Sequence, residues 1–405
     1  MPRDWFRGML NLDGMGQGIH LVRAHRDGER LMKIARIETI PVRIPLKPER
    51  RMISALGRHD VSDFLLVQVL TDDGIEGWGE ATVTPRWSGE TCFGAKAIVD
   101  GVLGPAVIGC RADEIVELDR RMDAMAVGNW FAKSAIEMAC WDSQGKSAGK
   151  PVYELLGGTC RPLTIRSRFS LGAYGPERAR SRAKELVEAG FTTIKVKVGV
   201  NPVEDVERVR IVRDVIGPNI GLTIDANGGW DVETAIRCIR ELESCQLTLV
   251  EQPIPPGDYT GLARVRKETG AKILADESCF DLIHADELIR HSACDAISLY
   301  PGKNDGIRKA IEIANLAEKH GIACSIGSNL EWDIGTAAMA HFIVATPNMN
   351  VELYPGDLLG PDYHEVSIAR NPLVIKGPMT TLGQGSGLGV DVDLDVVNHH
   401  RIDRT

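Results

Sequence analysis

The feature that most constrains this chain is a set of four short apolar runs that end in charged side chains at nearly equal intervals. The first is TTIKVKVG (residues 192–199), and the runs after it end in Asp225, Glu251 and Asp276. From Lys197 onward the charged residues are 28, 26 and 25 positions apart, the length that one strand, one helix and two loops take in a barrel of typical size. Short β-branched or aliphatic runs are typical of buried parallel strands. The spacing therefore predicts a (β/α) barrel with these side chains at one end.

Three carboxylates that converge at one barrel end would repel one another in a poorly hydrated site, so their charge needs a compensating cation. Oxygen ligands without His or Cys suit a hard ion, and we predict Mg²⁺, with Mn²⁺ as the alternative. Lys195 and Lys197 are two positions apart on one strand, so both side chains leave the same face, beside the metal. A neighbouring dication favours a neutral amine, which makes a lysine here a usable general base.

With these motifs the sequence resembles the enolase superfamily and, within it, the muconate lactonizing enzyme subgroup of the mandelate racemase/muconate lactonizing enzyme family. That subgroup carries Lys-x-Lys on the second barrel strand and Asp, Glu and Asp metal ligands on the third, fourth and fifth strands. The resemblance implies that Asp225, Glu251 and Asp276 hold the metal. It also implies that Lys197 removes the proton next to the substrate carboxylate with Lys195 beside it, and that the protein is a homo-oligomer.

Residues 32–160 are predicted to form an α+β capping domain. Apolar and polar residues alternate in segments 34–46 and 63–81, as in antiparallel strands, and helical spacing of apolar residues follows as far as residue 148. Strands followed by helices are the order of an α+β domain. Residues 1–31 show no clear periodicity and are expected to be a disordered leader.

Residues 161–371 are predicted to form the barrel, so the expected fold class is α/β, a modified TIM-type (β/α) barrel with an N-terminal α+β cap. Its first strand is predicted at 163–172 and its eighth at 351–354. The segment 372–405 is rich in strand and turn signals, and the resemblance implies that it returns to the cap.

The composition argues against several classes of protein. No apolar run approaches the roughly 20 residues that a membrane helix needs, and a hydrophobic fraction of 43% is that of a soluble globular protein. We therefore expect a cytoplasmic protein without a membrane partner. A net charge of −9 disfavours a nucleic-acid partner. The nine cysteines lack C-x-x-C spacing and are expected to be reduced thiols.

Two loops of the predicted cap carry basic and aromatic residues at 47–60 and 84–91. In the resembled family such loops contact the distal part of the substrate. An arginine can hold a carboxylate through two parallel hydrogen bonds. We therefore predict a small-molecule carboxylate substrate, and we predict that it is bound by Arg50, Arg51, Arg86 and Trp87.

The sixth strand departs from the family pattern. Family members place there a lysine that faces the lysine of the second strand, whereas this chain has Tyr300, and the next lysine, Lys303, aligns with a loop. The second base is therefore absent, replaced by a phenol, or supplied by an altered loop. Racemisation needs a base on each face of the reacting carbon, whereas cycloisomerisation and syn-elimination can use one base. Tyr300 is predicted to act as a proton donor or to shape the substrate pocket.

The seventh strand carries no histidine at its end, unlike mandelate racemase. Glu331 matches a glutamate that hydrogen-bonds around the site in the muconate lactonizing subgroup; the alternative is an acid that complements the start of the next helix. His320 and His341 are expected to be structural.

The predicted function is metal-dependent removal of the proton α to a carboxylate, giving an enediolate, followed by cycloisomerisation or β-elimination. These outcomes correspond to a muconate cycloisomerase-like enzyme or an acid-sugar dehydratase. The alternative is a racemase or epimerase of an amino-acid derivative, with Tyr300 or Lys303 as second base. A dipeptide epimerase is less expected, because the paired acids that bind an ammonium are missing from MNVELYPGD (349–357). An inactive binding protein is disfavoured because the lysine pair and all three acids are retained.

Overall fold

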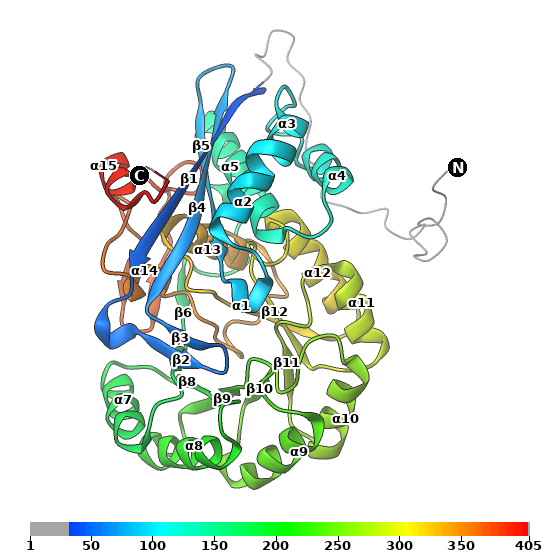
Figure 1. Cartoon of the computed structure of the whole chain (residues 1–405), viewed down its shortest axis with the longest axis vertical. Coiled ribbons are helices and arrows are strands. Elements are labelled where there is room, and N and C mark those ends of the chain that lie inside the picture. The colour runs from blue at the N-terminus through cyan, green and yellow to red at the C-terminus, as the bar shows by residue number, and fades with distance from the viewer. Residues whose placement is uncertain (1–31, 404–405) are drawn as a thin grey trace. The chain divides into compact units, whose positions relative to one another are not determined.

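A curved sheet of parallel strands carries the lysine and acid motifs. The computed structural model describes residues 32–403, and within this range the sheet has seven strands in the order β13-β12-β11-β10-β9-β8-β7. Figure 1 shows the helices arranged around the outside of this sheet. A parallel sheet with helices on its outer face, joined to a separate cap, confirms the predicted fold class.

The strands of this sheet are β7 (Phe169–Leu171), β8 (Thr193–Lys197), β9 (Gly221–Asp225), β10 (Leu249–Glu251), β11 (Ile273–Ala275), β12 (Ala296–Leu299) and β13 (Ala323–Ile326). The helices after them are α7 (Pro176–Glu188), α8 (Pro202–Ile216), α9 (Val232–Glu241), the short η4 (Glu243–Cys245), α10 (Tyr259–Thr269), α11 (Leu282–Arg290), α12 (Ile307–Lys319), α13 (Asp333–Ala345) and α14 (Gly360–Tyr363).

The structure corrects both end strands of the predicted barrel. The run 163–172 is split, because the N–H groups of Ser167 and Arg168 donate to the carbonyls of Pro378 and Gly356 and so leave the sheet. The run 351–354 is a turn instead of an eighth strand, and the parallel bridge to Cys324 lies earlier, at Met349. Its apolar pattern was misleading, since Leu353 is 61% exposed.

The cap is built on the three-stranded antiparallel sheet β1-β4-β5, with helix α5 packed directly on β5. An added Cβ at Gly79 would lie 1.8 Å from the carbonyl oxygen of Ala135, so only glycine permits this approach of helix to strand. The cap elements are β1 (Ile34–Pro45), η2 (Pro48–Arg50), β2 (Met52–Ser54), β3 (Gly57–His59), β4 (Val61–Thr71), β5 (Glu76–Val83), α1 (Pro85–Ser88), α2 (Cys92–Ile98), η3 (Val99–Leu103), α3 (Gly104–Val107), α4 (Ile115–Met125), α5 (Trp130–Ala148) and α6 (Val152–Leu155).

The C-terminal segment contacts both parts of the fold. Strands β14 (Val374–Lys376) and β15 (Met379–Thr381) form a small sheet with β6 (Thr164–Arg166). Beyond them, the N–H of Leu388 donates to Asp142 of α5 over 2.8 Å. The segment ends in α15 (Leu394–His400), after which the N–H of Ile402 donates to the carbonyl of Pro41 in β1.

The remaining sequence predictions can be placed against this fold. All nine cysteines are free, and burial raises the pKa of Cys279, at the end of β11, to about 12. Among residues 32–403 no helix has the length and apolar character that a membrane span requires. The predicted leader, residues 1–31, lies outside the described residues.

His341 of α13 lies in the core, where its Nδ1 accepts a hydrogen bond of 3.1 Å from the N–H of Tyr153. Burial lowers the pKa of His341 to about 4, so the folded protein favours the neutral ring. This contribution to stability is complete above the unfolded value of about 6.5 and is lost as the pH falls toward 4. Between pH 7.5 and pH 5 we expect the stability difference between the wild type and His341→Asn to shift by roughly 2 kcal/mol in favour of the variant. Urea unfolding at both pH values measures this shift, and a difference that does not change with pH would contradict it.

Candidate active site

The four charged residues at the ends of β8, β9 and β10 meet in one network. Lys195 Nζ lies 2.8 Å from Glu251 Oε1 and 2.9 Å from Asp225 Oδ2. Lys197 Nζ lies 2.6 Å from Asp225 Oδ2. The sheet register explains the meeting, because Asp225 is paired with Lys197 on one side and with Glu251 on the other. The structure thus brings together the side chains that the sequence spacing predicted at one barrel end.

The two lysines differ in their surroundings. Burial and the Arg168 guanidinium both oppose a charge on Lys195, but Asp225 and Glu251 outweigh them and raise its pKa. Burial opposes ionisation of Asp225, yet the two lysines together lower its carboxyl pKa below the usual range. Lys195 is therefore favoured as a cation. Both lysines line the cavity, and the Lys197 side chain is the more exposed of the two, 13% against 7%.

Sequence reasoning missed three residues of this network. Arg168 donates to Glu251 Oε2 over 2.8 Å. Asn227 accepts from Lys197 Nζ over 2.8 Å and donates to Glu277 Oε1 over 2.9 Å. A signal for Asn227 was present, because it stands two positions after Asp225 in the run LTIDAN. The sequence held no such signal for Arg168, because this residue stands inside a run that was predicted as one continuous strand.

Asp276 follows β11 directly and is held by Lys303 from the loop after β12. The Lys303 ammonium donates to Asp276 Oδ1 over 2.8 Å, to the Asp276 carbonyl over 2.9 Å and to the Ser298 carbonyl over 2.5 Å. The side chain is completely buried. All three donors of the ammonium are therefore used, and Lys303 has none to offer a substrate.

Tyr300 does not itself line the cavity but packs near Trp87, which does. It is completely buried, and its ring centroid lies 5.9 Å from that of Trp87 and 4.8 Å from Lys303 Nζ. Its hydroxyl has no hydrogen-bond partner in the described part of the chain. Burial, reinforced by the carboxylates of Asp276 and Glu331, raises its pKa well above the usual value. Tyr300 can therefore donate a hydrogen bond, but it does not supply a phenolate base.

Glu331 supports the loop after β13. Its Oε2 accepts from Ser328 Oγ over 2.6 Å, and both carboxylate oxygens accept from the N–H of Asn329 over 3.1 Å. Burial raises the pKa of Glu331 to about 7. Its bonds therefore go to a loop that lines the cavity and not to the start of α13.

Asp357 is a further residue that the sequence did not select as a site residue. It lines the cavity, is 3% exposed, and accepts from the N–H of Leu359 over 3.2 Å and from the Tyr363 hydroxyl over 3.1 Å. Within residues 32–403 neither Asp357 nor Glu331 forms an ion pair, in contrast to Asp225, Glu251 and Asp276.

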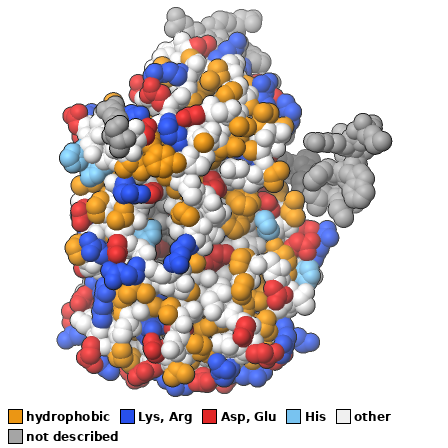
Figure 2. All heavy atoms as spheres, in the orientation of Figure 1, with side chains coloured by type: hydrophobic (Ala, Val, Ile, Leu, Met, Phe, Trp, Pro, Cys, Tyr) orange, Lys and Arg blue, Asp and Glu red, His pale blue; other side chains and the backbone are white. Residues whose placement is uncertain are grey.

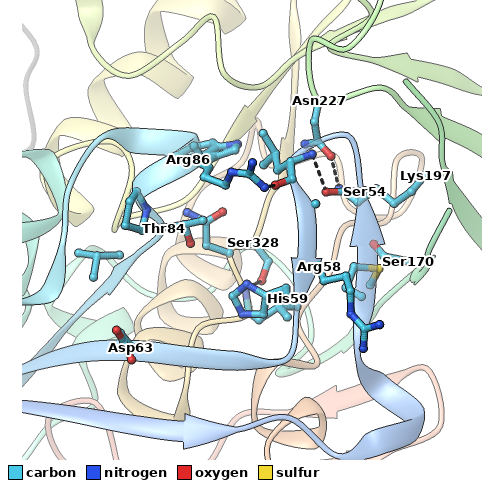
Figure 3. A pocket seen from close by; sticks show the side chains of 18 of the residues that line it. Ser54, Arg58, His59, Asp63, Thr84, Arg86, Ser170, Lys197, Asn227 and Ser328 are labelled. Atoms are coloured by element: carbon cyan, nitrogen blue, oxygen red, sulfur yellow. Dashed lines mark hydrogen bonds between the residues drawn. The ribbon is translucent and has the colours of Figure 1, made fainter. Parts of the chain in front are cut away.

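The cap loops meet the cavity through only two of the four predicted residues. Arg86 and Trp87 line it, and Figure 3 shows Arg86 reaching toward the turn between β2 and β3, where its Nη1 donates to the Leu56 carbonyl. Arg50 and Arg51 do not line the cavity, so their predicted contact with substrate stays a prediction. Arg50 pairs instead with Asp362.

The cavity has a volume of about 470 Å³. The lysine and carboxylate network lines it from the barrel. Its apolar lining residues are Met52, Leu56, Val61, Val83, Pro85, Phe93 and Leu330. Near its rim the Arg58 side chain is 68% exposed, and Figure 2 shows Lys and Arg side chains gathered on that side, over the β2–β3 hairpin.

The donor set fits a hard divalent cation in its chemistry, since Asp225, Glu251 and Asp276 offer only oxygen atoms. Glu277 Oε2 is buried and has no hydrogen-bond partner in the described residues. Burial, with repulsion from Asp276 and Asp225, raises the pKa of Glu277 to about 8. A cation would relieve this repulsion. In the structure each predicted ligand is paired with a lysine or arginine, and no closed group of three acidic, His or Cys ligands occurs among residues 32–403.

Comparison with known proteins gives the family. Residues 36–157 match the family model of the mandelate racemase / muconate lactonizing enzyme N-terminal domain, and residues 178–396 match the enolase C-terminal domain-like model. The chain belongs to the mandelate racemase/muconate lactonizing enzyme family of the enolase superfamily. The two matches confirm the family resemblance seen in the sequence. Members of that superfamily are enzymes, so this chain is an enzyme.

Relatives in this family divide between two reactions. The chain is 34% identical over 363 residues to a hydrophobic dipeptide epimerase of Enterococcus faecalis, covering 89% of this chain and 99% of the relative. It is 35% identical over 373 residues to a chloromuconate cycloisomerase of Delftia acidovorans, covering 91% and 99%. Family membership therefore does not choose between cycloisomerisation and epimerisation.

Similar solved structures include both kinds of enzyme and also the N-succinyl Arg/Lys racemase of Bacillus cereus, with a TM-score of 0.87 at 28% identity, covering 92% of this chain and 98% of the other. The muconate lactonizing enzyme of Pseudomonas fluorescens in complex with muconolactone matches with a TM-score of 0.87 at 31% identity, covering 92% of this chain and 100% of the other. The dipeptide epimerase of Enterococcus faecalis V583, complexed with Mg and the dipeptide L-Leu-L-Tyr, matches with a TM-score of 0.84 at 32% identity, covering 89% and 100%.

Proposed function

We propose that this enzyme removes the proton α to a substrate carboxylate with Lys197 and completes the reaction on that same face, by cycloisomerisation or by elimination of a β-substituent. The observation that carries the proposal is the state of the three candidate bases. Lys197 lines the cavity, the Lys303 ammonium is buried and fully hydrogen-bonded, and Tyr300 is held as a neutral phenol.

The chain's own residues divide the chemical work. Asp225, Glu251 and Asp276 would hold the divalent cation, which when bound supplies positive charge for the substrate carboxylate. Lys197 takes the α-proton at Nζ, and Asn227 Oδ1, 2.8 Å away, orients that nitrogen. Lys195, kept charged by Asp225 and Glu251, lies beside the site where negative charge develops in the enediolate.

The apolar residues that line the cavity support a substrate class. For a carboxylic acid bound at the lysine and carboxylate network, the same cavity offers Val61, Phe93 and Leu330 as apolar contacts for the rest of the molecule. Phe93 is 53% exposed and Val61 42% exposed, so a distal apolar group that covers them would gain free energy by removing apolar surface from water. We propose a carboxylic acid with an apolar or unsaturated distal portion.

A second candidate function is epimerisation of an amino-acid derivative, and Asp357 favours it. Asp357 supplies a carboxylate to the cavity without a cationic partner in the described residues, near Glu331, and such a site suits an ammonium group. This candidate requires a base on the face opposite Lys197. The two residues considered for that role, Tyr300 and Lys303, are completely buried and do not line the cavity, which makes epimerisation the second choice.

The test of the proposed function is turnover of a panel of acids with Mg²⁺ present: substituted muconates, dipeptides with apolar side chains, and N-acylated amino acids. Ultraviolet absorbance would follow ring closure, and optical rotation would follow inversion. We expect conversion of an acid with an apolar distal group and no inversion. Efficient inversion of a dipeptide would overturn the proposal in favour of epimerisation.

Tyr300→Phe is expected to raise the stability of the protein and to lower its activity. It removes a buried hydroxyl that has no partner within residues 32–403, so the free energy of unfolding should rise by about 1–2 kcal/mol. If the hydroxyl donates to the substrate in the reacting complex, kcat should fall by roughly tenfold in the same variant. Thermal unfolding and steady-state kinetics measure the two effects, and an unchanged kcat would assign Tyr300 to pocket shape alone.

A further inference from the structure

The loop between β12 and α12, residues 300–306, brings Tyr300 and Lys303 to the active site. On the barrel side it is held by the Lys303 ammonium on Asp276 and by Asn304, whose Nδ2 donates to the carbonyls of Cys279 and Phe280 over 3.1 Å each. These contacts hold the middle of the loop and do not reach its end, at the start of α12.

That far end is held by Glu137, from helix α5 of the cap. Glu137 Oε2 accepts from the N–H of Ile307 and Oε1 accepts from the N–H of Arg308, each over 2.9 Å. These are the first two N–H groups of α12, which no partner within the helix can satisfy. The N-cap residue of α12, Gly306, has no side chain to satisfy them. The Glu137 carboxylate, from the cap, therefore serves as the N-cap of α12.

The turn is shaped around this carboxylate. Gly306 has a φ of +115°, and an added Cβ would lie 2.6 Å from the carboxyl carbon of Glu137. Trp141 Nε1 donates to Glu137 Oε1 over 2.8 Å and fixes its orientation. Beside it, Ser134 Oγ donates to the Pro301 carbonyl over 2.8 Å. Two residues of α5, Ser134 and Glu137, thus hydrogen-bond to the two ends of the loop.

We propose that Glu137 is a positioning residue for the reaction: it sets the 300–306 loop so that the Lys303 ammonium stays on the Asp276 carboxylate and Tyr300 stays against Trp87. Glu137 is completely buried and does not line the cavity, so it acts through the loop and touches no substrate. The inference rests on the proposed function in one respect, since Asp276 is taken as a metal ligand. It adds that a cap residue controls that ligand.

The test compares Glu137→Gln with Asp142→Asn, a matched control on the same helix. Asp142 is also buried, and its carboxylate accepts from the N–H groups of Trp78 and Leu388, neither of which belongs to the loop. Titration calorimetry with Mn²⁺ on folded protein gives the metal affinity. We expect Glu137→Gln to bind Mn²⁺ 10- to 100-fold more weakly, to lose kcat, and to recover part of it at high metal concentration. Asp142→Asn should keep the wild-type metal affinity and kcat even where its stability falls.

Wild-type Mn²⁺ affinity and kcat in folded Glu137→Gln would overturn this inference and leave the proposed function intact. A wild-type protein that binds no Mn²⁺ would overturn the metal site of the proposed function itself. If Glu137→Gln does not fold, Ser134→Ala removes only the bond to Pro301 and should weaken Mn²⁺ binding by roughly threefold. An unchanged affinity in Ser134→Ala would then overturn the inference.

Discussion

Lys197→Ala is expected to lower kcat by roughly 10³-fold, because it removes the amine that takes the α-proton. The fold should survive the change, since Asp225 keeps its second partner, Lys195, at 2.9 Å. Metal affinity should change little, because Lys197 offers no oxygen ligand. Steady-state kinetics on a substrate found in the panel, with Mn²⁺ titration in parallel, would measure both quantities.

The control for this variant is Lys184→Ala on α7, whose side chain is 74% exposed. It changes the net charge by the same amount without touching the cavity, and its kcat should equal that of the wild type. A Lys197→Ala protein that keeps more than about a tenth of the wild-type kcat would be incompatible with Lys197 as the base.

Asp225→Asn is expected to abolish metal binding as well as activity. Asp225 is the shared partner of Lys195 and Lys197, so the substitution leaves two ammonium groups facing a neutral amide. Divalent affinity should fall by roughly 100-fold or more. The free energy of unfolding should fall by about 3 kcal/mol, because Lys197 loses its ion-pair partner while Lys195 keeps Glu251. Calorimetry with Mn²⁺ and urea unfolding would measure the two losses.

Asp231→Asn serves as its control. Asp231 lies six positions further along the chain and caps α9 by accepting from the N–H of Thr234 over 2.7 Å. It is exposed and does not line the cavity. Its loss should cost about 1 kcal/mol of stability and leave metal affinity unchanged. Wild-type metal affinity in Asp225→Asn would contradict the assignment of Asp225 as a ligand.

The sequence predicted the centre of the site well because two regular spacings in the sequence determine where its residues lie. Alternation along a strand puts Lys195 and Lys197 on one face, and the length of a βα unit brings Asp225 and Glu251 to neighbouring strand ends. Both spacings are local, so they can be read without knowledge of the tertiary structure.

The residues whose contacts the sequence did not indicate depend on distant segments. Arg50 looked like a substrate ligand, but its partner Asp362 stands 312 positions away. Asp357 lines the cavity from the irregular segment that follows residues 351–354, the run predicted as the eighth strand. Glu137 reads in the sequence as one more helical residue, because its partners, Ile307 and Arg308, are 170 and 171 positions away.

The central claim, that one base acts from one face, is tested most directly by α-proton exchange in D₂O. Both enantiomers of an α-chiral acid that binds the enzyme would be incubated separately with Mg²⁺, and exchange and configuration would be followed by ¹H NMR and chiral chromatography. The account predicts that one enantiomer exchanges its α-proton with retention and that the other does not exchange, with the exchange lost in Lys197→Ala. Exchange of both enantiomers with interconversion would show a second base opposite Lys197 and would contradict the account.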